Sequence, residues 1–184
     1  YGALHTRTTP QGAWRASDFL AWYLTHDTGP TLQKWPHYFE PYERHLRRFR
    51  HRRVTMLEIG VDDGGSLPMW RRYLGDRAEI YGADIVPETA SYANAAMYGS
   101  PAHIFIGDQA SEAFWINVRA RLPPQSVDIL IDDGGHNYKQ QRKTLDEAWR
   151  LLAPGGTYIC EDVHGGSNAF AQYVVTRFIV AATP

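Results

Sequence analysis

The segment that decides the fold is residues 127–136, which read VDILIDDGGH. Residues 157–164 have the same form and read TYICEDVH. In each segment, a short apolar run typical of a buried β-strand is followed at once by acidic residues and a histidine. Ligands of an open α/β sheet bind beyond the carboxyl ends of its strands, and carboxylates with an imidazole at that place suit a divalent cation and a general base. The sequence therefore predicts an α/β sheet with a functional site at this edge.

The rest of the chain alternates between strand-like and helix-like patterns. Apolar runs predict strands at residues 54–59, 80–85, 103–106, 127–131 and 157–160, and most of these runs are apolar at successive positions, as in strands buried on both faces. Helical patterns lie between them at residues 67–74, 88–97, 111–122 and 138–152. We expect the Pro-Gly-Gly of residues 154–156 to end the last of these helices. The alternation predicts a doubly wound, mostly parallel α/β sheet with helices on both faces.

About fifty residues precede the first strand. They predict a short helix at residues 18–24, a loop at 26–36 and a second helix at 41–53. We expect residues 1–53 to form an N-terminal helical lid or substrate segment, and residues 54–184 to form the main domain with a further helix at 169–182. The run of arginines and histidines in residues 43–53 either contacts RNA or forms a solvated helix face, and the near-neutral charge of the whole chain favours the second reading.

Composition narrows the class of protein. The chain has 184 residues, a hydrophobic share of 43% and a formal net charge of -1, which suit one globular domain without a general attraction to nucleic acid or membrane. Its single cysteine, Cys160, cannot form an internal disulfide, and no apolar run approaches the ~18 residues of a membrane helix. We therefore expect a cytoplasmic protein that binds neither nucleic acid nor membrane.

Three turns on the same edge of the predicted sheet carry ligand-binding signals. Residues 57–66, LEIGVDDGGS, follow the first strand and open a helix, but neither G-x-G-x-x-G nor a P-loop occurs, which disfavours a pyrophosphate cradle. Asp84 ends the second strand, where a carboxylate can accept hydrogen bonds from both ribose hydroxyls, and Asp108 follows the third, within reach of an adenine amino group. Each aspartate alone could be a helix cap or turn residue. Together they favour an adenosine-bearing ligand.

In this order, the motifs resemble those of the class I S-adenosylmethionine-dependent methyltransferases. The resemblance covers residues 54–162 and includes E-x-G-x-x-x-G at 58–64, Asp84, the Gly-Asp of 107–108, Asp132 and the Pro-Gly-Gly of 154–156. It implies a Rossmann-like sheet of strand order 3-2-1-4-5, of which the family's two further strands are not evident in this sequence. The cofactor contacts that we expect are Tyr38, Glu58, Gly60, Gly64, Ser66, Asp84, Asp108, Gln109 and Asp132.

Finer matches resemble the metal-dependent macrolide sugar O-methyltransferases of the mycinamicin and macrocin type, and related cephalosporin-biosynthesis proteins. They lie at residues 57–61, 64–67, 80–84, 132–136 and 161–164. The resemblance implies Mg²⁺ held by Asp133, Glu161 and Asp162, with His136 as general base and Asp133 also catalytic. It further implies that the segment containing His37 and Tyr38 closes over the cofactor.

Other readings of the same residues stay open. Asp132 and Asp133 could cap the helix that follows them, and His136 could be a turn residue. Since neighbouring strand residues point to opposite faces, we expect Asp132 on the cofactor side and Asp133 on the metal side. His164 is either a second group on the acceptor side or an inert loop residue.

Taken together, the sequence predicts an enzyme that transfers a methyl group to a hydroxyl of a small molecule, with Mg²⁺ and S-adenosylmethionine as cofactors. We expect the acceptor to be a glycoside or polyketide-type natural product, as in antibiotic biosynthesis, and the protein to be a homo-oligomer. The alternatives are a metal-independent RNA or protein methyltransferase and a non-catalytic cofactor-binding partner protein.

Overall fold

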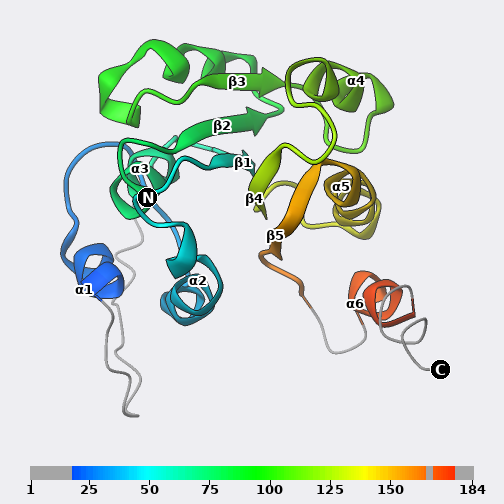
Figure 1. The fold of residues 1–184 in the computed structure, drawn as a ribbon, viewed down its shortest axis with the longest axis horizontal. Helices are drawn as coiled ribbons and strands as arrows, with labels where there is room; N and C mark the ends of the chain where they lie inside the picture. The colour runs from blue at the N-terminus through cyan, green and yellow to red at the C-terminus, as the bar shows by residue number, and fades with distance from the viewer. Residues whose placement is uncertain (1–17, 165–167, 177–184) are drawn as a thin grey trace, which may run out of the picture.

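The computed structural model describes residues 18–164 and 168–176, and its centre is a five-stranded parallel sheet (Figure 1). The strands lie side by side in the order β3-β2-β1-β4-β5. Their bounds are Thr55–Ile59 for β1, Glu79–Asp84 for β2, His103–Ile106 for β3, Val127–Asp132 for β4 and Leu152–Cys160 for β5. The predicted order and parallel arrangement are confirmed.

Helices cover both faces of the sheet, because successive strand residues point to opposite sides. On one face, Met56 of β1 packs with residues of α3, which spans Ser66–Leu74. On the other face, Leu57 packs with residues of α4 (Glu112–Arg121) and α5 (Tyr138–Leu151). Figure 1 shows α4 and α5 across the sheet from α1, α2 and α3. The structure is therefore doubly wound, as predicted.

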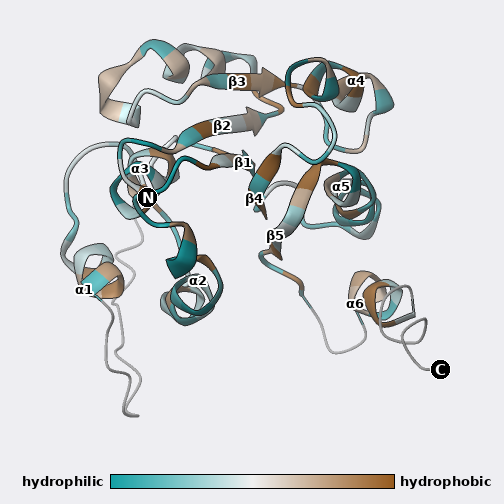
Figure 2. Cartoon of the chain, in the orientation of Figure 1, coloured by the Kyte–Doolittle hydropathy of each residue, from teal (hydrophilic) through white to brown (hydrophobic). Residues whose placement is uncertain are grey.

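The N-terminal segment adds a layer of its own over α3. It contains α1 (Asp18–Thr25), the 3₁₀ turns η1 (Pro36–Tyr38) and η2 (Arg47–Phe49), and α2 (Phe39–Leu46). The predicted helix over 41–53 thus begins two residues earlier and ends sooner. Figure 2 shows that α2 is mostly hydrophilic, in contrast to the largely hydrophobic β4. Buried side chains nevertheless anchor the layer to the core: Phe19 stacks on Tyr73 with ring centroids 4.3 Å apart, and Tyr42 contacts Trp70 at 5.0 Å.

Two predicted elements are wrong. Residues 88–97 form 3₁₀ turns, η3 (Pro87–Asn94) and η4 (Ala96–Tyr98), rather than an α-helix. Thr89 is the only residue of η3 that is fully buried, and Tyr92 and Ala93 are only partly buried against the core, so little buried apolar surface is available to stabilise a longer helix. The second error concerns the Pro-Gly-Gly of 154–156, which lies inside β5 instead of ending α5. It falls where the pairing with β4 slips between Val127 and Ile129, as at a β-bulge.

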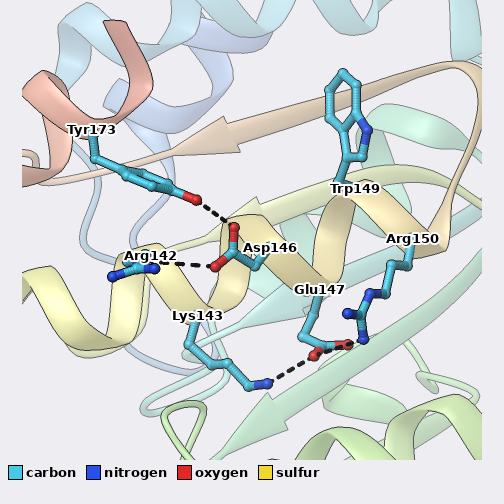
Figure 3. Close-up of a pocket in the computed structure, with 7 residues that line it drawn as sticks. All are labelled: Arg142, Lys143, Asp146, Glu147, Trp149, Arg150 and Tyr173. Atoms are coloured by element: carbon cyan, nitrogen blue, oxygen red, sulfur yellow. Dashed lines mark hydrogen bonds and ion pairs between the residues drawn. The ribbon is translucent and has the colours of Figure 1, made fainter. Parts of the chain in front are cut away.

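The last described helix is α6, Ala169–Val174, and the remainder of the helix predicted over 169–182 lies outside the described residues beyond position 176. α6 faces α5 across a hollow of about 560 Å³ (Figure 3). The polar side chains that line it bind one another: Tyr173 Oη donates to Asp146 Oδ1 at 2.6 Å, and Lys143 Nζ donates to Glu147 Oε1 at 2.8 Å. We therefore interpret this hollow as part of the packing between α5 and α6 and not as a ligand site. Among the described helices, none has the length and apolar character needed to cross a membrane.

Candidate active site

A cavity of about 1290 Å³ runs along the carboxyl edge of the sheet. Its walls are the loops that follow the strands, and residues 31–38 of the N-terminal segment cover it. Ligand pockets commonly measure about 300–1,000 Å³. This cavity therefore has room for two ligands side by side, as a group transfer requires.

At one end of the cavity, which we call the β2–β3 end, Asp84 and Asp108 line the wall. Asp84 Oδ2 accepts the backbone N–H groups of Val61 and Asp62, both at 3.0 Å, and its Oδ1 accepts that of Val86 at 2.9 Å. Asp108 Oδ1 accepts the N–H of Ala110 at 2.8 Å. A carboxylate has about four lone-pair sites, so both aspartates keep acceptor capacity for a ligand.

The loop after β1 passes against the loop after β4, and Gly60 permits this approach. Its φ is +85°, and a Cβ at this position would lie 2.1 Å from the carbonyl oxygen of Asp133. Any other residue would both strain the backbone and push the two loops apart. Ser66 also lines the cavity, and its Oγ donates to the buried Glu58 at 2.6 Å.

Three residues expected to contact the cofactor, Glu58, Gly64 and Asp132, are absent from the described lining of the cavity. Glu58 is fully buried and accepts from Trp70 Nε1 at 2.9 Å. Gly64 packs against the ring of Tyr98. Asp132 is buried between Gln109 Nε2 at 2.9 Å and Tyr158 Oη at 3.1 Å, and burial raises the pKa of Asp132 to about 6. These three residues therefore support the walls of the cavity from behind and do not face its interior.

At the other end, which we call the β4–β5 end, the structure brings together Asp133, His136 and Asp162. One possible ligand atom from each lies within 4.8 Å of the others. Asp162 Oδ2 is 3.8 Å from His136 Nε2. Tyr38 holds Asp162 from the N-terminal segment: its hydroxyl donates to Asp162 Oδ1 at 2.6 Å and accepts the Asp162 N–H at 2.9 Å. Two half-buried carboxylates beside an imidazole suit a hard divalent cation.

Glu161 is not a member of that group of three, and Lys34 and Tyr42 hold its carboxylate. Tyr42 Oη donates to Glu161 Oε1 at 2.5 Å, and Lys34 Nζ donates to Glu161 Oε2 at 2.9 Å. The residue is only 2% exposed, and burial raises the pKa of its carboxyl to about 7. Both oxygens already have partners, so the geometry distinguishes Glu161 from the other two acids expected to bind metal.

Lys34 is the residue that sequence reasoning missed. Its ammonium group contacts carboxylates from three strand ends: Asp133 at 2.6 Å, Glu161 at 2.9 Å and Glu58 at 3.5 Å. Burial lowers the pKa of Lys34 and these carboxylates raise it, with a net upward shift that keeps the amine charged. A lysine in a polar loop gives no periodic signal. The only available clue was that several buried acids at one sheet edge require a counter-charge.

His164 also lies at the β4–β5 end and lines the cavity. Its ring centroid is 6.1 Å from that of His136, with the planes nearly perpendicular. Its backbone carbonyl accepts from Asn168 Nδ2 at 2.5 Å, so a hydrogen bond joins His164 to the residue that precedes α6. Both readings of His164 stay predictions, and the structure adds that the residue lines the cavity.

Comparison with known proteins gives a consistent result. The model of a family described as a methyltransferase domain matches residues 57–163. Demethylmacrocin O-methyltransferase of Streptomyces fradiae is 36% identical over 140 residues, which cover 71% of this chain and 33% of that protein. Mycinamicin VI 2''-O-methyltransferase of Micromonospora griseorubida is 35% identical over 135 residues, covering 69% and 32%. The chain thus spans about a third of the length of these curated relatives.

A solved structure agrees with these matches. The MycE methyltransferase of the mycinamycin biosynthetic pathway, crystallised in complex with Mg and SAH, superposes with a TM-score of 0.62 at 30% identity. The match covers 80% of this chain and 39% of that one. The resemblance drawn from the sequence motifs is confirmed.

Proposed function

Because the chain belongs to the methyltransferase family whose model matches residues 57–163, we propose that it transfers a methyl group from S-adenosylmethionine to a hydroxyl of a small molecule. The observation that carries this proposal is the arrangement of one cavity with two different ends. Asp84 and Asp108 at the β2–β3 end suit the ribose and adenine of the cofactor. Asp133, His136 and Asp162 at the β4–β5 end suit an acceptor hydroxyl and a cation.

The relatives support a glycoside as the acceptor. The names of the two enzymes above describe O-methylation of macrolide compounds, and a third relative, from Streptomyces olivaceus, is named as a 2'-O-methyltransferase of a rhamnosyl tetracenomycin. We propose the same class of acceptor here, a sugar hydroxyl on a polyketide-type natural product. The aromatic side chains of Trp35 and Tyr38 line the same cavity and suit the apolar part of such a molecule.

The bound cofactors would supply two things: a methyl group already activated on a sulfonium, and positive charge from Mg²⁺ that lowers the pKa of a nearby hydroxyl. Asp133 and Asp162 would hold the cation with hard oxygen donors. We propose that Glu161, the third ligand implied by the resemblance, instead anchors Lys34 and Tyr42 beside them. In this proposal Asp133 and Asp162 are the metal ligands, and Glu161 stabilises the cavity wall beside them.

His136 is the proposed general base. Its ring is exposed at the cavity wall, where it would take the proton of the acceptor hydroxyl as the oxygen–methyl bond forms and the sulfur–methyl bond breaks. The carboxylate of Asp162, at 3.8 Å from Nε2, stands beside the positive charge that the ring then gains. Alignment of the hydroxyl with the methyl group supplies the rest of the rate enhancement, because a fixed geometry removes an entropic cost.

The test begins with calorimetry using S-adenosylhomocysteine, followed by methyl transfer to demethylmacrocin and to the rhamnosyl tetracenomycin acceptor. We expect nucleoside binding, and methyl transfer that stops with EDTA and returns with Mg²⁺. Failure to bind S-adenosylhomocysteine would end the proposal. Transfer that continues unchanged in EDTA would remove the metal from it and leave the cofactor site.

Replacing the proposed base gives a sharper prediction. His136→Ala should lower turnover about 10²–10⁴-fold while leaving affinity for S-adenosylhomocysteine unchanged, because the β2–β3 end is intact. His164→Ala is the matched control and should have a smaller effect, since that ring lies farther from Asp162. Steady-state rates from about pH 6 to about pH 9 measure both. Full activity of the His136 variant over that range would contradict the assignment.

A further inference from the structure

Gln109 lies in the loop after β3 and forms hydrogen bonds with four other residues. The sequence predicted for it only a contact with the cofactor. Its side chain is almost completely buried. Nε2 donates to Asp132 Oδ1 at 2.9 Å and to Thr144 Oγ1 of α5 at 2.8 Å. The backbone carbonyl oxygen of Gln109 accepts from Trp115 Nε1 of α4 at 2.7 Å. Both side-chain donor hydrogens are thus committed within the protein.

The remaining polar atom of the side chain reaches the loop of residues 133–136, which carries Asp133 and His136. Gln109 Oε1 accepts the backbone N–H of Gly135 at 2.7 Å. One amide group therefore links the end of β4, the first turns of α5 and the loop between them. Asp132 Oδ1 also accepts a backbone N–H of this loop, that of Gly134, but at the longer distance of 3.5 Å.

The contact between Gln109 and this loop also explains why residue 134 is a glycine. A Cβ at this position would lie 2.0 Å from Gln109 Oε1 and 2.9 Å from its Cδ. Its φ lies outside the left-handed region, so the backbone conformation itself would accept another residue. The first glycine of the DDGGH motif is therefore required chiefly because Gln109 lies against it.

We propose that Gln109 is a positioning residue that fixes the 133–136 loop, and thereby places Asp133 and His136 relative to the methyl acceptor. The inference rests on the proposed function for its catalytic meaning, but its structural part stands on the contacts of Gln109 alone. A displacement of about 1 Å in a reacting group can cost about 10²-fold in rate, so a single well-placed amide can matter as much as a catalytic group.

Gln109→Met tests the proposal because methionine is similar in length but cannot form these hydrogen bonds. We expect the Gly135 amide to exchange with solvent at least about tenfold faster, while the Glu161 amide, bonded to Asp132 O at 2.8 Å, stays protected. Affinity for S-adenosylhomocysteine should change less than about threefold, and turnover should fall about tenfold or more. Val118→Ala, in the buried face of α4, controls for a general loss of stability and should leave the Gly135 amide and turnover unchanged.

A double-mutant cycle with Gly134 separates positioning from direct cofactor contact. Gly134→Ala should lower turnover and speed Gly135 exchange about tenfold in the natural background, but less than about twofold further when Gln109→Ala has removed the obstructing amide. Equal penalties in both backgrounds would overturn the proposal, as would loss of S-adenosylhomocysteine affinity in Gln109→Met with Gly135 exchange unchanged. If the natural protein transfers no methyl group, the proposed function fails, and the exchange measurements still decide whether Gln109 fixes the loop.

Discussion

At the β2–β3 end of the cavity, Asp84 and Asp108 are held by backbone N–H groups of neighbouring loops, whereas at the β4–β5 end the acids are held by side chains from far away in the sequence. Asp84 accepts from Val61 and Asp62, about 23 positions away. Asp133 and Glu161 are instead held by Lys34, which is 99 and 127 positions away. One end is assembled by the sheet itself, and the other depends on the N-terminal segment.

The difference follows from the charge that each end concentrates. Two separated, solvent-facing aspartates can be satisfied by local amide groups. Glu58, Asp133 and Glu161 lie close together, with two of them buried, and such a group requires a cation to be stable. Lys34 supplies this positive charge from the N-terminal segment, which precedes the first strand of the sheet. The layer formed by α1 and α2 is therefore part of the site as well as its cover.

The largest expected effect comes from removing that ammonium group. Lys34→Met should lower the free energy of unfolding by about 3–5 kcal/mol, because buried carboxylates lose their counter-charge. Urea denaturation followed by fluorescence measures the change. Glu161→Gln added to Lys34→Met should recover part of the loss, because it removes one of the uncompensated charges.

The control for this prediction is Lys139→Met, at an exposed lysine of α5, which should change stability by less than about 0.5 kcal/mol. If Lys34→Met were as stable as the natural protein, the N-terminal segment would be a removable cover, and the two ends of the cavity would be equally self-contained.

The same comparison explains what the sequence could predict. The β2–β3 end was predictable because each aspartate directly follows an apolar strand, and strand order then places both at one edge. Lys34 was not predictable, since its partners come from three strands and only the folded chain brings them together. Gln109 was predicted only as a cofactor contact, and its buried partners Asp132 and Thr144 could not be read from spacing. The 3₁₀ turns of 87–98 were mistaken for a helix because the local pattern does not reveal how little of this segment is fully buried.

At the β2–β3 end, Asp84→Asn should weaken binding of S-adenosylhomocysteine about tenfold, or about 1.4 kcal/mol, because the amide replaces one of the acceptor oxygens that we propose bind the ribose with a donor. Calorimetry with the nucleoside measures it. Asp84→Asn should lower the free energy of unfolding by less than Lys34→Met does, since the hydrogen bonds that it affects are local and partly exposed. A variant with natural affinity for the nucleoside but impaired Mg²⁺ binding would mean that the two ends have been assigned the wrong way round.

The smallest effect should come from Tyr38→Phe, which keeps the ring and removes only the hydroxyl that contacts Asp162. Asp162 has a φ of +51°, and the tyrosine hydroxyl bonds both its N–H and its carboxylate, so loss of that hydroxyl should let this proposed ligand turn. We expect Mg²⁺ affinity, measured by calorimetry in the presence of S-adenosylhomocysteine, to fall about fivefold, or about 1 kcal/mol, with nucleoside affinity unchanged. Tyr92→Phe, whose ring stacks on Tyr98 beside Gly64, is the control and should leave Mg²⁺ affinity alone. Equal Mg²⁺ affinities in Tyr38→Phe and the natural protein would show that the N-terminal segment stabilises the β4–β5 end through Lys34 and Tyr42 alone, and that Asp162 keeps its position without Tyr38.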